Sequence, residues 1–186
     1  MAISCENVHA TIGEFQRQYI YKLYLETIPE GIDSSFSGAQ DFQTKIDLYN
    51  EKAVFPDRKT NAITIKWGGE FFDIPGTDGS TRNYEFSFYD DEDMKVYNFF
   101  SACKDLTGND TNQACVVGPK AKFDIGVAKV SVDKDKITAY RRLKGCRVYS
   151  VKSDDISKSA DGVSKITVEI RWDYNRNDAT KVGQSA

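Results

Sequence analysis

Apolar and polar residues alternate along several segments of the chain, which is the pattern of a β-strand with one buried face. The clearest segment runs from residue 165 to residue 174. Its apolar positions are Ile166, Val168, Ile170, Trp172 and Tyr174. Further strands are predicted over residues 19–25, 42–48, 63–67, 71–74, 84–89, 122–132 and 137–151. The segment 19–25 is partly apolar on both faces, so we expect it to be buried on two sides.

One helix is predicted among these strands, over about residues 91–107. Apolar side chains recur there at helical spacing, at Val96, Phe99, Cys103 and Leu106. The acids from Asp90 to Asp93 supply N-cap candidates and first-turn carboxylates that suit the helix dipole. The element order therefore predicts a mainly β fold, an antiparallel sandwich or barrel with one packed α-helix.

The composition fits a single folded domain. The chain has 186 residues, 40% of them hydrophobic, and a formal net charge of −3. We expect an N-terminal arm over residues 1–17, one domain over 18–175 and a polar C-terminal tail over 176–186. The first residues lack the pattern of a signal peptide, and no apolar run approaches the ~20 residues of a membrane span, so no membrane contact is expected.

The sequence offers little catalytic chemistry. It has one histidine, His9 in the expected arm, and neither a nucleophile motif nor a phosphate-binding loop. Helix capping accounts for the acids at 90–93 better than metal binding does. We therefore expect no enzyme, no cofactor and no metal site.

The basic residues and the cysteines leave several alternatives open. The basic cluster is Arg141, Arg142, Lys144 and Arg147. Neighbouring residues of a strand point to opposite faces, so we expect a partner interface or a solvated edge here rather than a nucleic-acid site.

None of the cysteines has metal-type spacing. Cys103 lies on the apolar stripe of the helix, so we expect a buried free thiol there. Cys5 in the arm and Cys115 in a loop could form disulfides, within or between chains, if the protein leaves the cell.

Several short motifs occur in an order that matches a known family. They are Gly13–Arg17 before Tyr19–Leu23, Phe42–Leu48 before a polar loop at 49–60, Tyr84–Phe88 before Asp91–Asp93, Arg142–Cys146, and Ile166–Tyr174. Across residues 12–175 this order resembles the tail tube protein of contractile-tailed phages of the T-even type, which is related to type VI secretion tube proteins.

The resemblance implies a structural protein that forms hexameric rings, which stack into a hollow tube. Each protomer would give about four strands to an inner wall of about 24, whose spacing and tilt leave a bore of ~38 Å, wide enough for duplex DNA. The implied partners are further copies of the chain, the sheath, tape measure, baseplate and tail terminator proteins, and genomic DNA passing without specific binding. The implied location is the virion tail, assembled in the host cytoplasm.

The resemblance also suggests interface and lumen residues. The loop at 49–60 would reach the next ring through Glu51, Lys52, Val54, Phe55, Asp57 and Arg58. Contacts of the arm and wall strands would involve Phe15, Arg17, Tyr19 and Tyr21. Candidate lumen residues are Thr167, Glu169 and Asp173. An acidic lumen would repel the passing DNA, and Arg171 on the same face does not fit such a surface.

Two rival functions remain open at this point. One is the tube protein of a type VI secretion or tailocin-like apparatus, which the sequence barely separates from a phage tube. The other, from a different class, is a β-sandwich module for carbohydrate binding or adhesion, whose aromatic residues would gather on one exposed patch.

Overall fold

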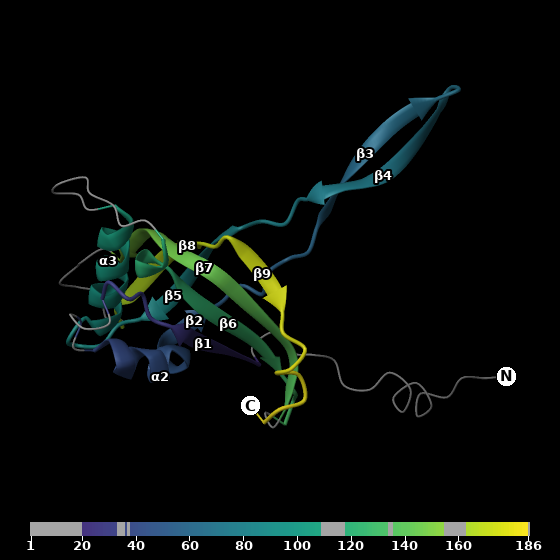
Figure 1. Cartoon of the computed structure of the whole chain (residues 1–186). Coiled ribbons are helices and arrows are strands. Elements are labelled where there is room, and N and C mark those ends of the chain that lie inside the picture. The colour runs from purple at the N-terminus through teal and green to yellow at the C-terminus, as the bar shows by residue number, and fades with distance from the viewer. Residues whose placement is uncertain are drawn as a thin grey trace.

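The computed structural model describes residues 20–32, 36, 38–108, 118–133, 136–154 and 163–185. The elements that it contains are shown in Figure 1. In chain order they are β1 (Tyr21–Thr27), α2 (Ala39–Tyr49), β2 (Asn50–Lys52), β3 (Thr60–Trp67), β4 (Glu70–Asp78), β5 (Asn83–Tyr89), α3 (Lys95–Thr107), the 3₁₀ turn η1 (Pro119–Ala121), β6 (Phe123–Val130), β7 (Ile137–Ser153), β8 (Lys165–Arg171) and β9 (Tyr174–Asn177).

The main sheet is antiparallel and has the strand order β1-β6-β7-β8-β5-β2, with β9 also paired to β7. The first half of β7 pairs with β6 and β9, and its second half, from Arg147 onward, pairs with β8. Gly145 separates the halves with a φ of 68°, a left-handed conformation that glycine adopts without strain. The expectation of a mainly β antiparallel fold is confirmed.

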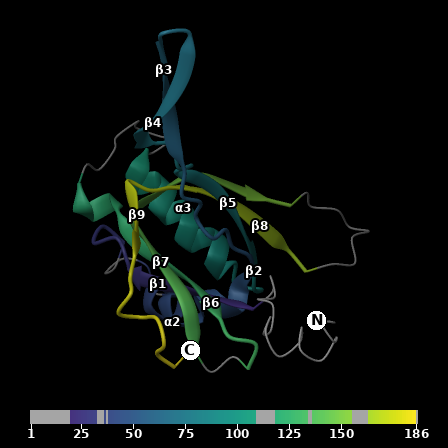
Figure 2. The same cartoon turned by 90° about the vertical axis from the view of Figure 1, so that its right-hand side faces the viewer.

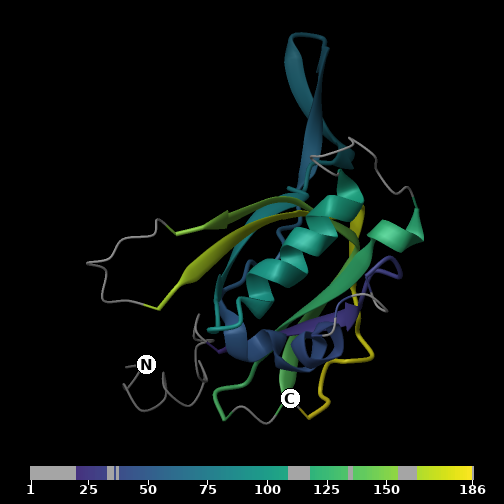
Figure 3. The same ribbon diagram turned by 90° about the vertical axis from the view of Figure 1, so that its left-hand side faces the viewer.

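One core fills the space between the two halves of the sheet and the helices. Leu23 and Ile125 from one half join Phe86 and Ile170 from the other in a single buried cluster. α3 crosses the sheet (Figure 3) and packs mainly against β7, whereas α2 packs against β1. The helices contribute aromatic side chains to this core, among them Phe42, Phe99 and Phe100, whose rings contact one another.

A smaller apolar cluster lies outside this core. It consists of Ile20, Ala128, Val130, Ile137 and Tyr140, with Tyr24 packed against it. Phe123, Ile125 and Val127 of the same strand face the main core. The two-sided burial expected for residues 19–25 therefore falls mainly on β6.

β3 and β4 form a separate hairpin that projects from the body of the molecule (Figures 1 and 2). Gly68 and Gly69 make its turn, with φ values of 60° and 93°. Every residue of β3 is exposed. Because the hairpin contributes nothing to the core, its apolar side chains need another explanation.

Residues 42–48, predicted as a strand, lie in α2, so that prediction is wrong. The buried positions of α2 are Ala39, Phe42 and Ile46, which recur at helical spacing, while Leu48 is exposed. A short stretch with apolar residues at 42, 46 and 48 fits both periods, and contact with β1 and α3 selects the helix. Among the described residues, the fold thus has two packed α-helices rather than one.

Three further boundaries differ from expectation. α3 begins at Lys95, after the acids at 90–93 rather than among them, with Met94 between. Tyr174 is half exposed in β9, while Trp172 is buried as expected. In the expected tail, the Ile137 amide donates to the Gln184 carbonyl at 3.0 Å and the Gly183 amide donates to the Ile137 carbonyl at 2.8 Å. The chain from 174 to 185 is therefore tied to β7 rather than frayed.

Over the described residues, the helices are all too short or too polar to cross a membrane.

Candidate assembly surfaces

The hairpin carries an apolar face. Cross-strand register places Ile63 opposite Ile74 and Ile65 opposite Phe72, and directly opposed residues of an antiparallel pair point to the same side. Trp67 lies two positions beyond Ile65 and joins this face. These five side chains are between 42% and 78% exposed.

The opposite face of the hairpin is more polar, although it also carries Phe71, which is 69% exposed. The Thr64 hydroxyl donates to an Asp73 carboxylate oxygen at 2.6 Å, and the Lys66 ammonium lies 5.7 Å from the centroid of the Phe71 ring. The hairpin is therefore an amphipathic ribbon whose apolar side no described part of the chain covers.

The segment from 49 to 60 belongs largely to the body of the molecule. Phe55 is half-buried beneath two cations, with the Lys129 ammonium 4.6 Å and the Arg141 guanidinium 5.9 Å from its ring centroid. Val54 is also half-buried, and Asp57 accepts a hydrogen bond from the Thr81 amide at 3.1 Å. The expected apolar anchors thus pack within their own chain, and the exposed apolar surface lies on the hairpin that follows.

The charged members of that segment are more exposed. Lys52 and Arg58 are open to solvent. Glu51 pairs with Lys165 and accepts a hydrogen bond from the Tyr89 hydroxyl, and the bond from Lys165 lowers the pKa of Glu51. These contacts hold the start of the segment against β8 and β5, while the stacking role of the segment stays a prediction.

Of the expected arm and wall residues, the structure places Tyr21. Its hydroxyl hydrogen-bonds to Asn50 Oδ1 at 2.8 Å and to the Glu51 carbonyl at 2.9 Å, and burial raises its pKa. Tyr21 therefore ties β1 to β2 inside the protomer. Phe15, Arg17, Tyr19, Cys5 and Cys115 lie outside the described residues.

The candidate lumen residues lie on the polar face of the sheet or at its end. Thr167 and Glu169 are half-buried on β8, and Asp173 is exposed just after it. A guanidinium nitrogen of Arg171 lies 3.1 Å from a Glu169 oxygen, and the guanidinium carbon of Arg171 lies 4.1 Å from the Tyr149 ring centroid. This face is therefore mixed in charge rather than uniformly acidic.

An open pocket of about 290 Å³ lies beside these residues, at the end of the sheet where the hairpin departs. Arg82, Arg147 and Arg171 contribute to its lining, together with Tyr149, Trp172 and Asp173. We call it the arginine pocket. Its lining combines fixed guanidinium groups with aromatic side chains, a combination that suits planar anions. No local sequence pattern indicates this pocket, because Arg82 is far in sequence from the other arginines.

Asp173 holds several elements together at the edge of the pocket. Its carboxylate lies 2.6 Å from the Lys122 ammonium and 3.9 Å from a guanidinium nitrogen of Arg147. Arg82 donates to its backbone carbonyl at 2.9 Å. A side chain at position 145 would collide with the Asp173 carboxylate, so glycine is needed there for space as well as for conformation.

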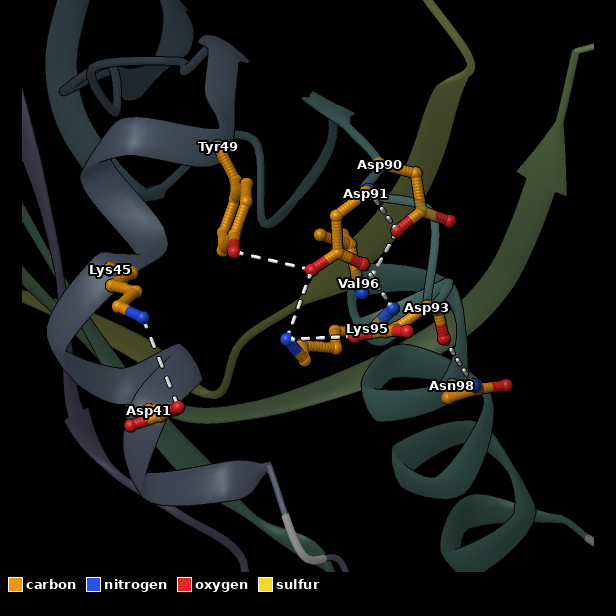
Figure 4. A network of polar contacts seen from close by, with 9 residues as sticks. All are labelled: Asp41, Lys45, Tyr49, Asp90, Asp91, Asp93, Lys95, Val96 and Asn98. Carbon is orange, nitrogen blue, oxygen red and sulfur yellow. Dashed lines mark hydrogen bonds and ion pairs between the residues drawn. The ribbon is translucent and has the colours of Figure 1, made fainter.

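An acidic turn, Asp90–Asp93, connects β5 to α3 at the other end of β5 (Figure 4). Asp90 Oδ1 accepts hydrogen bonds from the Val96 and Asp91 amides, each at 3.1 Å, and Asp91 Oδ1 accepts one from the Lys95 amide at 2.9 Å. These acids satisfy the free N–H groups of the first helical turn. The expected positions are wrong, because the N-cap residue is Met94, in a left-handed conformation with a φ of 51°, and no acid lies in the first turn of α3. Asp90 and Asp91 accept the helical amide hydrogens from positions before the N-cap.

The acids of this turn differ in environment. Burial raises the pKa of Asp90, whose Oδ2 is buried without a hydrogen-bond partner among the described residues. Burial also acts upward on Asp91, but the Lys95 amide and ammonium hold the pKa of Asp91 below its ordinary value. Glu92 and Asp93 are exposed. The turn thus presents two carboxylates to solvent, although Asp93 is also paired with Lys95 at 3.1 Å.

The cysteines inside the described part of the chain are unreactive in character. Cys103 and Cys146 are free and buried, and burial raises the pKa of both thiols. Within the described ranges no three His, Cys, Asp or Glu side chains gather in a way that could hold a metal ion.

Comparison with known proteins supports the fold rather than a sequence family. No protein-family model and no curated protein matches the sequence. Among solved structures, one match is a chain of the PVC sheath/tube terminator in the extended state, from an extracellular contractile injection system. The match has a TM-score of 0.60 and 13% sequence identity, and it covers 90% of this chain and 99% of that chain.

Two other assemblies contain the same fold. The anti-feeding prophage cap, described as a tube terminating cap, matches with a TM-score of 0.60 and 12% identity over 90% of this chain and 93% of that one. The PVC sheath–tube complex matches with a TM-score of 0.56 and 12% identity over 96% and 99%. The chain therefore has the fold found in tube and tube-end assemblies of contractile injection systems, and the expected resemblance in fold is confirmed.

Proposed function

We propose that this protein is a structural subunit of a hollow tube, built from stacked rings of the chain, in a contractile phage tail or a related injection apparatus. The observation that carries the proposal is the amphipathic hairpin on a tube-type fold. Its exposed apolar side chains serve no purpose in the core of one protomer, and contiguous exposed apolar surface marks sites of protein association.

The backbone of the hairpin supports the same conclusion. Among the described strands, β3 and β4 pair only with each other, so each keeps one edge that no described strand covers. Exposed apolar strands with free edges aggregate unless a specific partner covers them. A neighbouring copy in a symmetric assembly is the simplest cover, since every copy then gives one hairpin and receives another.

The finer parts of the proposal follow the resemblance. The rings are hexameric, the partners are the sheath, baseplate, tape measure and terminator proteins, and genomic DNA passes through the bore. The particle is assembled in the host cytoplasm and ends as a virion tail. The subunit has no catalytic role. Charged residues of the 49–60 segment, such as Lys52 and Arg58, assist ring contacts from the rim.

A single substitution on the hairpin tests the proposal. Ile65→Lys places a charge on the apolar face, so we expect rings or tubes of the purified protein to be lost in negative-stain micrographs and the protein to sediment as smaller species. Thr64→Lys is the matched control, because its side chain lies on the opposite face beside Asp73 and should leave assembly intact. A wild-type chain that stays monomeric at high concentration would refute the proposal.

A second candidate function is the tube terminator, which ends a tube instead of extending it. Two solved structures that match at a TM-score of 0.60 come from a terminator and a cap. The same micrographs separate the candidates, since a repeating tube subunit gives long tubes of variable length and a terminator gives isolated rings.

A further inference from the structure

The arginine pocket brings two side chains of like charge together. The β7–β8 register places Arg147 directly opposite Arg171, and like charges directly opposite each other on paired strands repel. Asn83 continues the same row on β5. An anion bound between the two guanidinium groups would remove the repulsion.

The contacts of the two arginines leave donors for such an anion. Arg147 is 3.9 Å from the Asp173 carboxylate, beyond hydrogen-bonding distance, so this contact uses none of its N–H groups. Arg171 is oriented by stacking on Tyr149, and its hydrogen bond to Glu169 engages one nitrogen. A guanidinium has five N–H donors in a fixed fork, which suits bidentate binding of a carboxylate.

The acidic turn lies at the opposite end of the same strand. Asn83 at the start of β5 lines the arginine pocket, and Tyr89 at its end precedes Asp90. Seven residues of strand separate the two sites by about 23 Å at 3.3 Å per residue, so they cannot meet within one protomer. The hairpin leaves from the pocket end, between Asp78 and Arg82.

We propose that the arginine pocket of one copy receives the exposed carboxylates of Glu92 and Asp93 from the next copy along the tube. The inference rests on the proposed function, because it requires stacked copies, and it specifies the polarity of stacking as hairpin end to acidic-turn end. Such a contact is head to tail, and repetition of a head-to-tail contact produces a filament.

The surroundings of the pocket favour a carboxylate of a neighbouring chain over a nucleic-acid phosphate. Glu169 and Asp173 stand beside the guanidinium groups, and Glu85 lies opposite Glu169 on the same face. The phosphates of a nucleic acid lying across this face would be repelled by all three carboxylates. Single side chains from the acidic turn can reach the guanidinium groups without lying along the whole face.

A charge-swap experiment tests the pairing. The double substitution Arg147→Glu with Arg171→Glu should raise the critical concentration for pelletable assemblies at least about tenfold, because attraction becomes repulsion. Glu92→Lys with Asp93→Lys should do the same from the other end. The four substitutions together should restore assembly to near the wild-type concentration. Lys136→Glu with Lys181→Glu is the control, because it changes the net charge by the same amount at residues that belong to neither the arginine pocket nor the acidic turn, and it should have little effect.

Each outcome decides the question. If each swap abolishes assembly and the combination does not restore it, or if both swaps assemble like the wild type, the pairing is wrong. If the arginine swap assembles normally but loses affinity for duplex DNA in fluorescence anisotropy, the pocket binds nucleic acid and the inference is overturned. Failure of the wild-type chain to stack would instead refute the proposed function and the inference together. Circular dichroism verifies that each variant is folded.

Discussion

Gly145 illustrates how one residue can determine the shape of the whole sheet. It allows β7 to turn from its partners β6 and β9 toward β8, and it leaves room for the Asp173 carboxylate that binds Lys122. The sequence showed a Lys-Gly-Cys stretch inside a predicted strand, but neither the ion pair nor the bend could be inferred, because Asp173 and Lys122 are remote in sequence.

Replacing Gly145 by alanine should therefore cost more than left-handed strain alone. Gly118 is a matched control, because it also has a positive φ, 90°, but open space around it. We expect Gly118→Ala to lower the free energy of unfolding by about 1–2 kcal/mol, and Gly145→Ala to lower it further, since alanine must also displace Asp173. Chemical denaturation of both variants measures the difference, and equal losses would contradict the steric role of Asp173.

At the scale of elements, α2 protects an edge of the sheet. Asp47 Oδ1 accepts a hydrogen bond from the Leu23 amide at 2.7 Å, and Gln43 Nε2 donates to the Glu26 carbonyl at 3.3 Å. In an antiparallel ladder, hydrogen-bonded pairs of residues alternate with pairs that are not hydrogen-bonded. The Val130 amide donates to the Ile20 carbonyl, so Leu23, three residues further along the chain in β1, falls in a pair of the other kind and its amide points away from β6. The helix thus occupies a strand edge that would otherwise be free to aggregate.

Asp47→Ala should uncover that edge. The unmade hydrogen bond of the Leu23 amide is expected to lower the free energy of unfolding by about 1–3 kcal/mol and to increase light scattering on mild heating. Asp41→Ala on the same helix is the control, since Asp41 makes an exposed ion pair with Lys45 at 3.9 Å and should change stability little. Equal behaviour of the two variants would show that α2 does not protect the edge in this way.

Local patterns predicted most elements, but they missed α2 and the projection of the β3–β4 hairpin. β8 and α3 each bury one face. Their apolar residues therefore recur with the period of a strand or of a helix, and that period alone was enough to predict both elements. The prediction for α2 was wrong because its short apolar stretch fits both the period of a strand and that of a helix. The hairpin strands were expected, yet their projection was not, since alternation predicts one buried face and no described residue of the protomer covers this face.

On the scale of the whole molecule, the body and the hairpin are separable. The hairpin is closed at its base by hydrogen bonds from the Gly79 amide to the Lys59 carbonyl at 2.8 Å and from the Lys59 amide to the Ser80 hydroxyl at 3.0 Å. None of the hairpin residues belongs to either apolar cluster of the body. The polarity of the protomer follows, with a hairpin and a basic pocket at one end and an acidic turn at the other.

Deleting residues 60–78 and joining the ends with a short glycine-serine linker should leave a folded body. We expect its thermal unfolding midpoint to remain within a few degrees of that of the full chain, because no buried apolar contact is removed. The same protein should form no tubes in negative stain. A deletion variant that unfolds, or one that still forms tubes, would contradict the division of roles between body and hairpin.

The length of β7 has a mechanical consequence. This strand of 17 residues spans about 55 Å when extended and hydrogen-bonds to three other strands along its course. The two halves of the sheet have separate ladders but share this one strand, so load applied at one end of the protomer is carried to the other through the continuous covalent backbone of β7. In the tube proposed above, this continuous strand would carry load through each subunit.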